Sequence, residues 1–174
     1  MTAPLYTREI LRLAASIPHL EPFDELEGAT ELRSPTCGSR MRMAVELDWA
    51  DRIVRLRQAV EACAFGQATA ALMGGHAMGR SKEEAEAALK ELEAWLAGTG
   101  EVPTSWPGLE ALAPARSRKG RHGAILLPFR ALVAAIEQAQ GAWNRKLPRR
   151  RAQSSKAARS CLERRCCSSR CSAS

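Results

Sequence analysis

Apolar residues recur along the chain with two different periods, and the change of period outlines a mixed α and β fold. Residues 5–17 carry apolar side chains at helical spacing, and Pro18 ends that run. Apolar and polar residues then alternate strictly over 40–48, and a second extended run follows over 52–60 after a turn at 48–51. Two such runs joined by a short turn predict an antiparallel hairpin.

The apolar positions of this hairpin predict which face of the sheet is buried. Residues 29–33 add a short strand before it. On the first strand of the hairpin the inward set is Met41, Met43, Val45 and Leu47. On the second strand the inward set is Val54, Leu56 and Val60. We expect one half-buried sheet of about three strands, with a polar outer face.

Three further segments read as helices that would cover this sheet. Residues 63–73 are rich in small side chains and stop at a glycine pair, 74–75. The next helix begins with a capping box, Ser81 with Glu84, and ends at Gly98. The last helix is predicted to begin near Leu127, with Pro128 at its first position. The fold class is therefore α+β, a small antiparallel sheet covered on one side by several helices.

The charge of +7 is unevenly distributed and divides the chain in two. Residues 1–144 hold 16 Lys and Arg against 18 Asp and Glu, whereas residues 145–174 hold 10 against one. We therefore predict a domain over 1–143 and a disordered, basic tail over 144–174. Nucleic-acid binding does not follow for the acidic domain, but the tail could bind nucleic acid or another polyanion weakly. A second hypothesis is that the tail is an out-of-frame or poorly selected extension.

Neither a secretory signal nor an apolar run long enough for a membrane span is visible, so we expect a cytoplasmic protein. Thiols stay reduced in that compartment, where cysteines serve metals or sulfur chemistry more often than disulfides. The four tail cysteines lack the paired spacing of zinc modules, so no structural zinc site is predicted there.

Two cysteines of the domain are candidates for that chemistry. Cys63 stands where the second strand gives way to the small-residue helix, and the positive end of a helix favours the thiolate. Cys37 lies in the loop Ser-Pro-Thr-Cys-Gly-Ser-Arg, in which Gly38 permits unusual backbone angles. The predicted hairpin carries Cys37 at one end and returns the chain to Cys63 at that same end. The two thiols are expected to be neighbours.

The two cysteines and their surroundings resemble the scaffold family of iron–sulfur cluster assembly, of the IscU, SufU and NifU N-terminal type. Members of that family carry Asn-Pro-x-Cys-Gly-Asp before a strand pair, a cysteine heading an Ala/Ser-rich helix, and a third cysteine opening the last helix. Cys37 and Cys63 match the first two. Ser39 replaces the family aspartate, and the third cysteine falls on Ala124 or, in another register, on Gly123. The ligand set is incomplete.

The resemblance implies a scaffold rather than an enzyme, with a cysteine desulfurase and other assembly proteins as partners. His122 borders the position of the third ligand and is the best additional candidate. Two thiolates and an imidazole could hold iron or zinc with one coordination position left open. A [2Fe–2S] cluster would be labile and would need a further ligand, from a second protomer or glutathione. A basic cluster before this histidine is a candidate docking surface or a solvated loop: Arg116, Arg118, Lys119 and Arg121.

Two other functions are alternatives to the scaffold hypothesis. A sulfur acceptor of the SufE kind, which shares this general fold, needs a single exposed thiolate, and Cys37 would carry the persulfide. Alternatively, the chain is a degenerate member that keeps the fold as a binding module without metal.

Overall fold

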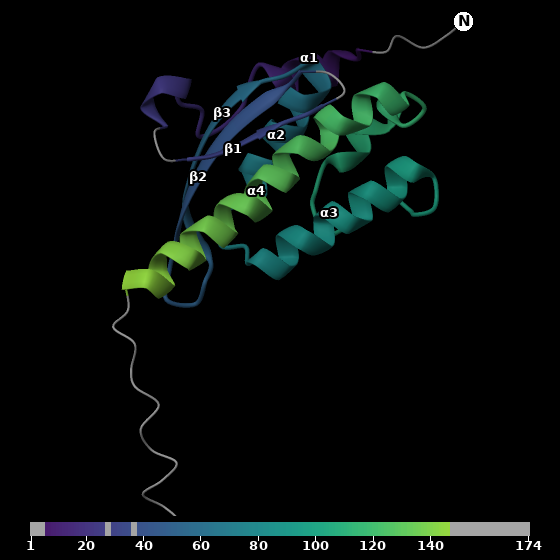
Figure 1. The fold of residues 1–174 in the computed structure, drawn as a ribbon. Helices are drawn as coiled ribbons and strands as arrows, with labels where there is room; N and C mark the ends of the chain where they lie inside the picture. Colours follow the sequence, from purple (N-terminus) through teal and green to yellow (C-terminus); the bar gives the residue numbers. More distant parts are fainter. Residues whose placement is uncertain (1–5, 27–28, 36–37, 147–174) are drawn as a thin grey trace, which may run out of the picture. The chain divides into compact units, whose positions relative to one another are not determined.

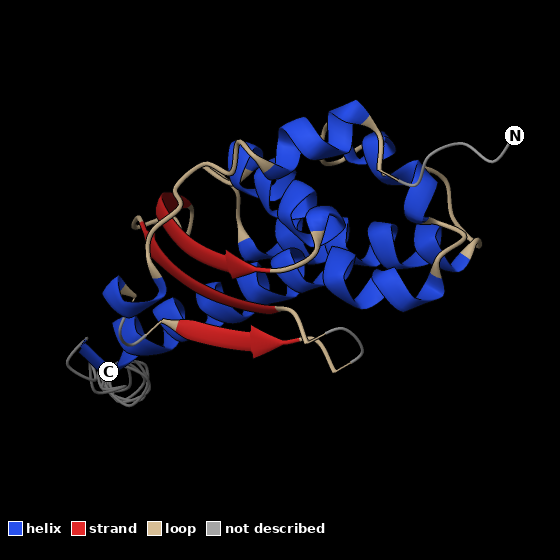
Figure 2. Cartoon of the chain, turned by 90° about the horizontal axis from the view of Figure 1, so that it is seen from above, coloured by secondary structure: helices blue, strands red, loops and turns tan. Residues whose placement is uncertain are grey.

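Three antiparallel strands form the sheet, in the order β1, β2, β3 (Figure 2). The structure, a computed structural model, describes residues 6–26, 29–35 and 38–146. Strand β1 spans Thr30–Arg33, β2 spans Arg40–Leu47 and β3 spans Ile53–Glu61. The turn between β2 and β3 is held by the Asp48 carboxylate, which accepts hydrogen bonds from the backbone amides of Ala50 and Arg52. The predicted three strands and their hairpin are confirmed.

Helices cover one face of this sheet (Figure 1). Four are α-helical: α1 (Arg8–Ala14), α2 (Ala64–His76), α3 (Lys82–Ala97) and α4 (Lys119–Lys146). The described residues also form two short 3-10 helices, η1 (Phe23–Glu25) and η2 (Leu109–Ala115). Phe23 of η1 lies under the guanidinium groups of Arg40 and Arg42, on the face of the sheet opposite to Met41 and Met43. The α+β class is therefore as predicted. Among the helices of the described residues, none is long and apolar enough to span a bilayer.

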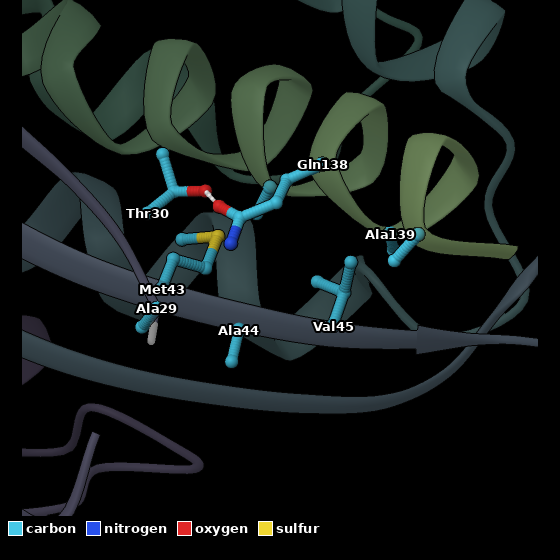
Figure 3. A pocket seen from close by; sticks show the side chains of 9 residues that line it. Ala29, Thr30, Met43, Ala44, Val45, Gln138 and Ala139 are labelled. Carbon is cyan, nitrogen blue, oxygen red and sulfur yellow. Dashed lines mark hydrogen bonds between the residues drawn. The ribbon is translucent and has the colours of Figure 1, made fainter. Parts of the chain in front are cut away.

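Helix α4 lies across the β1 and β2 side of the sheet, and α3 runs beside it (Figure 1). A shallow groove between sheet and helix is lined mainly by small side chains, among them Ala135 and Ala139 of α4, and Thr30 donates a hydrogen bond to Gln138 across it (Figure 3). Ion pairs Lys82–Glu137, at 2.8 Å, and Arg130–Glu93, at 2.7 Å, join α3 to α4.

The hydrophobic core lies between the sheet and the helices. Met41 and Met43 of β2 are fully buried there, as are Phe65 of α2 and Phe129 of α4. Trp106, also fully buried, donates its indole N–H to the Leu72 carbonyl of α2 at 3.1 Å, and its ring meets Phe129 edge-on. The indole therefore connects the loop before η2 to α2 and α4.

The capping predictions for α3 are confirmed in detail. The Ser81 hydroxyl accepts from the Glu84 amide, and the Glu84 carboxylate accepts from the Ser81 amide, so both halves of the capping box are formed. Gly98 ends the helix with a φ of 84°, in the left-handed region that glycine adopts without strain.

The predicted start of the last helix is wrong by two turns. Helix α4 begins at Lys119, so Pro128 lies within it and not at its first position. Pro128 suggested the first helical position, but the preceding residues are helical as well, and Ala124 and Ile125 are fully buried there. Because proline has no amide proton, the Ala124 carbonyl loses its usual helical donor.

Three smaller predictions need correction. Val54 points outward, half exposed, because the β2–β3 register shifts near Glu46 and Leu47, and Ile53 takes the buried position. Helix α2 continues through its glycine pair to His76. Helix α1 is shorter than residues 5–17: Thr7 caps it and it ends at Ala14, while Leu5 lies outside the described residues.

The chain divides into two units, Met1–Trp143 and Asn144–Ser174. Residues 147–174 lie outside the described part of the chain. The predicted division into a domain and a disordered tail stays a prediction.

Candidate functional site

The loop between β1 and β2 that contains Cys37 is closed at its base by two backbone hydrogen bonds. The Ser34 amide donates to the Ser39 carbonyl at 2.8 Å, and the Gly38 amide donates to the Ser34 carbonyl at 3.2 Å. Gly38 has a φ of 67°, as its place in this loop led us to expect. Ser39 is buried and Gly38 exposed. Thr36 and Cys37 lie outside the described residues.

The register of the hairpin brings the two segments of the predicted site to the same end of the β2–β3 ladder. Arg40, the first residue of β2, is paired with Glu61, the last residue of β3. Gly38 therefore precedes β2, and Cys63 follows β3, at the same end of the ladder. The predicted hairpin is confirmed, but Cys37 lies outside the described residues, so the proximity of the two thiols stays a prediction.

Cys63 is the N-cap of α2. Its backbone is extended, with φ of −66° and ψ of 165°, and its carbonyl accepts the first helical bond, from Gln67 at 3.0 Å. The thiol makes no capping hydrogen bond, is half-buried, and is not in a disulfide. A thiol at this position lies beside the unpaired amides and positive end of a 13-residue helix. A half-buried thiol is a candidate ligand for a soft cation.

The first turn of α2 packs against the second turn of α4. A Cβ added to Gly66 would lie 3.1 Å from the Ala124 carbonyl oxygen and 3.5 Å from the Ala124 Cβ. This carbonyl is the one that Pro128 leaves without its helical donor. Gly66 lies one turn after Cys63, so the segment that carries His122, Gly123 and Ala124 borders the start of α2.

His122 lies in the first turn of α4 and is half-buried. Its Nε2 is 2.9 Å from the Arg116 carbonyl oxygen. Gly123 is half-buried as well, whereas Ala124 is fully buried against α2. The two candidate positions of the third cysteine therefore differ sharply in their access to solvent.

The four basic residues before and within this turn do not behave alike. Arg116 is structural: its Nε donates to the Trp95 carbonyl at 2.9 Å, and its guanidinium lies over the Trp95 ring, 5.8 Å from the centroid. Arg116, Arg118 and Lys119 are all exposed and Arg121 is half-buried, so Arg116 differs from its neighbours in its contacts and not in its exposure. Within the described residues, these side chains make no ion pair with an acidic group.

An ion pair that sequence reasoning missed lies at the end of the β2–β3 ladder nearest Gly38 and Cys63. The Arg40 guanidinium binds the Glu61 carboxylate at two points, Nη2 to Oε1 at 2.6 Å and Nε to Oε2. This hydrogen bonding holds the pKa of Glu61 below its ordinary value of 4.5 and raises the pKa of Arg40. Arg40 also lies over the ring of Phe23, 4.5 Å from its centroid. The opposite charges at the outer ends of the two strands were the signal.

The donor set within the described residues is small. No group of three His, Cys, Asp or Glu side chains there lies close enough to hold a metal ion. Cys63 and His122 supply one soft sulfur and one imidazole nitrogen, which suit zinc and iron. The further donor that the sequence predicted, Cys37, lies outside the described residues.

Comparison with protein families gives one match. The sequence model of the NifU-like N terminal domain matches residues 5–115. The matched segment contains Cys37 and Cys63, and it stops before α4 and His122. No protein among those with curated descriptions matches the chain.

Several solved structures share the fold. A nitrogen-fixing NifU-like protein (N-terminal) from Brucella abortus is 25% identical, with a TM-score of 0.71 over 79% of this chain and 95% of that one. A putative iron–sulfur cluster assembly scaffold protein for the SUF system, from Fervidobacterium islandicum AW-1, is 20% identical, with a TM-score of 0.67 over 76% and 96%. A hypothetical protein is 25% identical, with a TM-score of 0.59 over 74% and 94%.

Proposed function

The chain belongs to the NifU-like N-terminal domain family, and from this premise we propose that it acts in iron–sulfur cluster assembly as a scaffold that binds iron, zinc or a labile cluster. Cys37 and Cys63 supply thiolates to the cargo and His122 assists with its imidazole. The protein holds and hands on this cargo and is not an enzyme. One of its structural neighbours is described as a putative scaffold of this kind.

The observation that carries the proposal is the pairing of Arg40 with Glu61. This pairing supports a shared site because the loop of Cys37 and the N-cap Cys63 leave the sheet at the same end. The contact of Gly66 with Ala124 supports the assistance of His122, since it brings the start of α4 against the start of α2.

The composition of the site favours weak retention of a cluster. Ser39, where the family carries an aspartate, adds no negative charge, and neither Gly123 nor Ala124 adds a thiolate. Three protein ligands leave one position of a tetrahedral ion open to water or to a ligand from a partner. An open position suits a scaffold, because the cargo must leave as readily as it is built.

Three basic residues beside this site are the proposed docking surface for an acidic region of the sulfur donor, a cysteine desulfurase. Arg118, Lys119 and Arg121 carry this role. Arg116 does not, since its guanidinium is engaged by Trp95. Charges on such a rim act chiefly on the rate of association, so replacing them should slow sulfur delivery at low salt more than at high salt.

The test is anaerobic reconstitution of the full chain in a background that removes the tail thiols. Cys161, Cys166, Cys167 and Cys171 are changed to serine so that they cannot capture metal. Cys37→Ser and Cys63→Ser are each expected to abolish stoichiometric iron or zinc, and His122→Ala to weaken it several-fold. His76→Ala is the matched control, because His76 is exposed at the far end of α2 and should not matter.

Equal and negligible metal in the background protein and in Cys63→Ser would refute the metal site. The sulfur-acceptor function would then be supported if incubation with a desulfurase and cysteine adds one sulfur atom to the mass of the chain. In that reaction the Cys37 thiolate attacks the terminal sulfur of the enzyme's persulfide, whose sulfur–sulfur bond breaks to return the enzyme thiolate. No metal and no added sulfur would leave a binding module.

A further inference from the structure

The contact between His122 and the Arg116 carbonyl defines which nitrogen of the imidazole carries the proton. A carbonyl oxygen only accepts hydrogen bonds, so the Nε2 that lies 2.9 Å from it must donate. In the neutral imidazole the proton is then on Nε2, and Nδ1 keeps its lone pair. His122 is therefore held as the tautomer whose free donor atom is Nδ1.

The accepting carbonyl is itself held in place. Arg116 is the C-cap of η2, where its amide donates to Ala113 at 3.1 Å. Its side chain crosses to α3, where Nε donates to the Trp95 carbonyl and the guanidinium covers the indole. Contacts at both the backbone and the side chain fix the Arg116 peptide relative to the core, because Trp95 is 2% exposed.

We propose that Arg116 is a positioning residue for His122: its carbonyl fixes the Nε2–H tautomer, so that the imidazole binds the metal through Nδ1. Metal-binding histidines in proteins commonly donate their second ring N–H to a backbone carbonyl, which sets both tautomer and ring orientation. The ligation rests on the proposed metal site, whereas the tautomer is a property of the chain without metal.

The tautomer can be read directly by nuclear magnetic resonance. Long-range proton–nitrogen correlation separates the ring nitrogens, and the chain has three histidines, so His122→Gln assigns the relevant signals. The sample is the full chain with the four tail cysteines changed to serine, at about pH 8. We expect a protonated Nε2 and an unprotonated Nδ1 for His122, and on adding zinc alone a shift at Nδ1 with Nε2 still protonated.

A pair of variants separates positioning from electrostatics. Arg116→Ala removes the contacts with Trp95, so we expect a mixture of tautomers and zinc affinity lower by about tenfold or more. Arg118→Ala removes the same charge from an exposed side chain two residues away and should leave the tautomer unchanged. Loss of a positive charge near a cation would by itself tighten zinc binding, so a purely electrostatic role predicts the opposite sign for Arg116→Ala.

The outcomes distinguish this role from the proposed function. An Nδ1–H tautomer in the metal-free chain, or zinc bound through Nε2, overturns the positioning role and leaves the metal site standing. The Nε2–H tautomer in a chain that binds no zinc overturns ligation through Nδ1 together with the proposed function. If Arg116→Ala does not fold, the tautomer and the metal-binding nitrogen of His122 are still read from the chain that keeps Arg116, with and without zinc.

Discussion

Arg40 and Glu61 form a two-point ion pair across the β2–β3 ladder, at the end of the sheet where both cysteine-bearing segments begin. Arg40 is the third residue after Cys37 and Glu61 the second before Cys63. The pair is solvent-exposed, so we expect little from it in global stability. Its effect is local, since it joins the backbone segments on which the proposed site depends.

This pair predicts a pH-dependent contribution that Glu61→Gln removes. The Arg40 hydrogen bond lowers the pKa of Glu61 from 4.5, so the stabilisation is fully present above pH 4.5 and is lost as the pH falls through the folded-state value. The melting temperature of Glu61→Gln should therefore fall slightly below that of the wild type at neutral pH and meet it in acid. A difference that persists unchanged in acid would contradict the assignment.

Variants of the same pair should change the amount of metal that the protein retains. The direction of that change distinguishes a positional role of the ion pair from an effect of its charge. If the ion pair holds the two segments in register, Arg40→Gln and Glu61→Gln should both reduce zinc or iron retention. A simple field effect would make Arg40→Gln bind the cation more tightly. Glu46→Gln breaks the exposed Arg55 pair at the other end of the hairpin and is the control, for which no change is expected.

Glycine positions in α2 predict a pair of substitutions with opposite effects on stability. In Gly66→Ala the new Cβ would lie 2.7 Å from the Ala62 Cβ and 3.1 Å from the Ala124 carbonyl, so we expect a loss of about 1–2 kcal/mol. In Gly75→Ala the Cβ meets nothing within 4 Å, and the better helix propensity should add about 0.5–1 kcal/mol. Urea denaturation measures both, and a stabilised Gly66→Ala would show that the α2–α4 contact is looser than described.

A fourth prediction concerns the basic tail. Because α4 ends at Lys146 and the charge of the chain changes sharply near that point, ending the chain after Lys146 should leave the melting temperature unchanged. Calorimetry of the shortened and full chains is the measurement. A drop of several degrees would mean that the tail buries apolar surface, and the predicted domain boundary would then be wrong.

The parts of the fold that the sequence predicted well are those decided by local chemistry. Strict alternation over β2 and the reciprocal bonds of Ser81 with Glu84 involve residues close in the chain, and both are present. The prediction that Val54 faces inward was wrong because a register shift depends on how two strands pair. The predicted start of α4 was wrong because the burial of Ala124 against Gly66 brings together residues that are far apart in the sequence.

The candidate site divides in the same way. The N-cap position of Cys63 and the left-handed Gly38 follow from neighbouring residues and were predicted. Arg116 was grouped with its basic neighbours, because nothing near it in the chain reveals that Trp95, 21 residues earlier, accepts its guanidinium. A side chain's role in an interface or in a site depends on such distant partners, which a single sequence does not display.

The last prediction concerns the missing third thiolate, whose position is either Gly123 or Ala124. Gly123 is half-buried beside His122, so a thiolate there can meet a metal that arrives from solvent. Ala124 is fully buried against Gly66, and a sulfur atom would have to displace α2. We expect Gly123→Cys to raise the cobalt or zinc retained after dialysis and to add a thiolate-to-cobalt absorption band. Ala124→Cys should lower the free energy of unfolding by about 1–3 kcal/mol with no gain in metal.

The two variants place the same atom one residue apart on α4, so each is the control for the other. Both are made with the tail cysteines changed to serine, and Gly123→Ser tests whether added bulk alone alters the site. If Ala124→Cys retains metal and Gly123→Cys does not, the start of α4 is rotated toward α2 in the bound state. Access from solvent would then be the wrong criterion, because the metal would enter with the helices apart and be enclosed as α2 and α4 close on it.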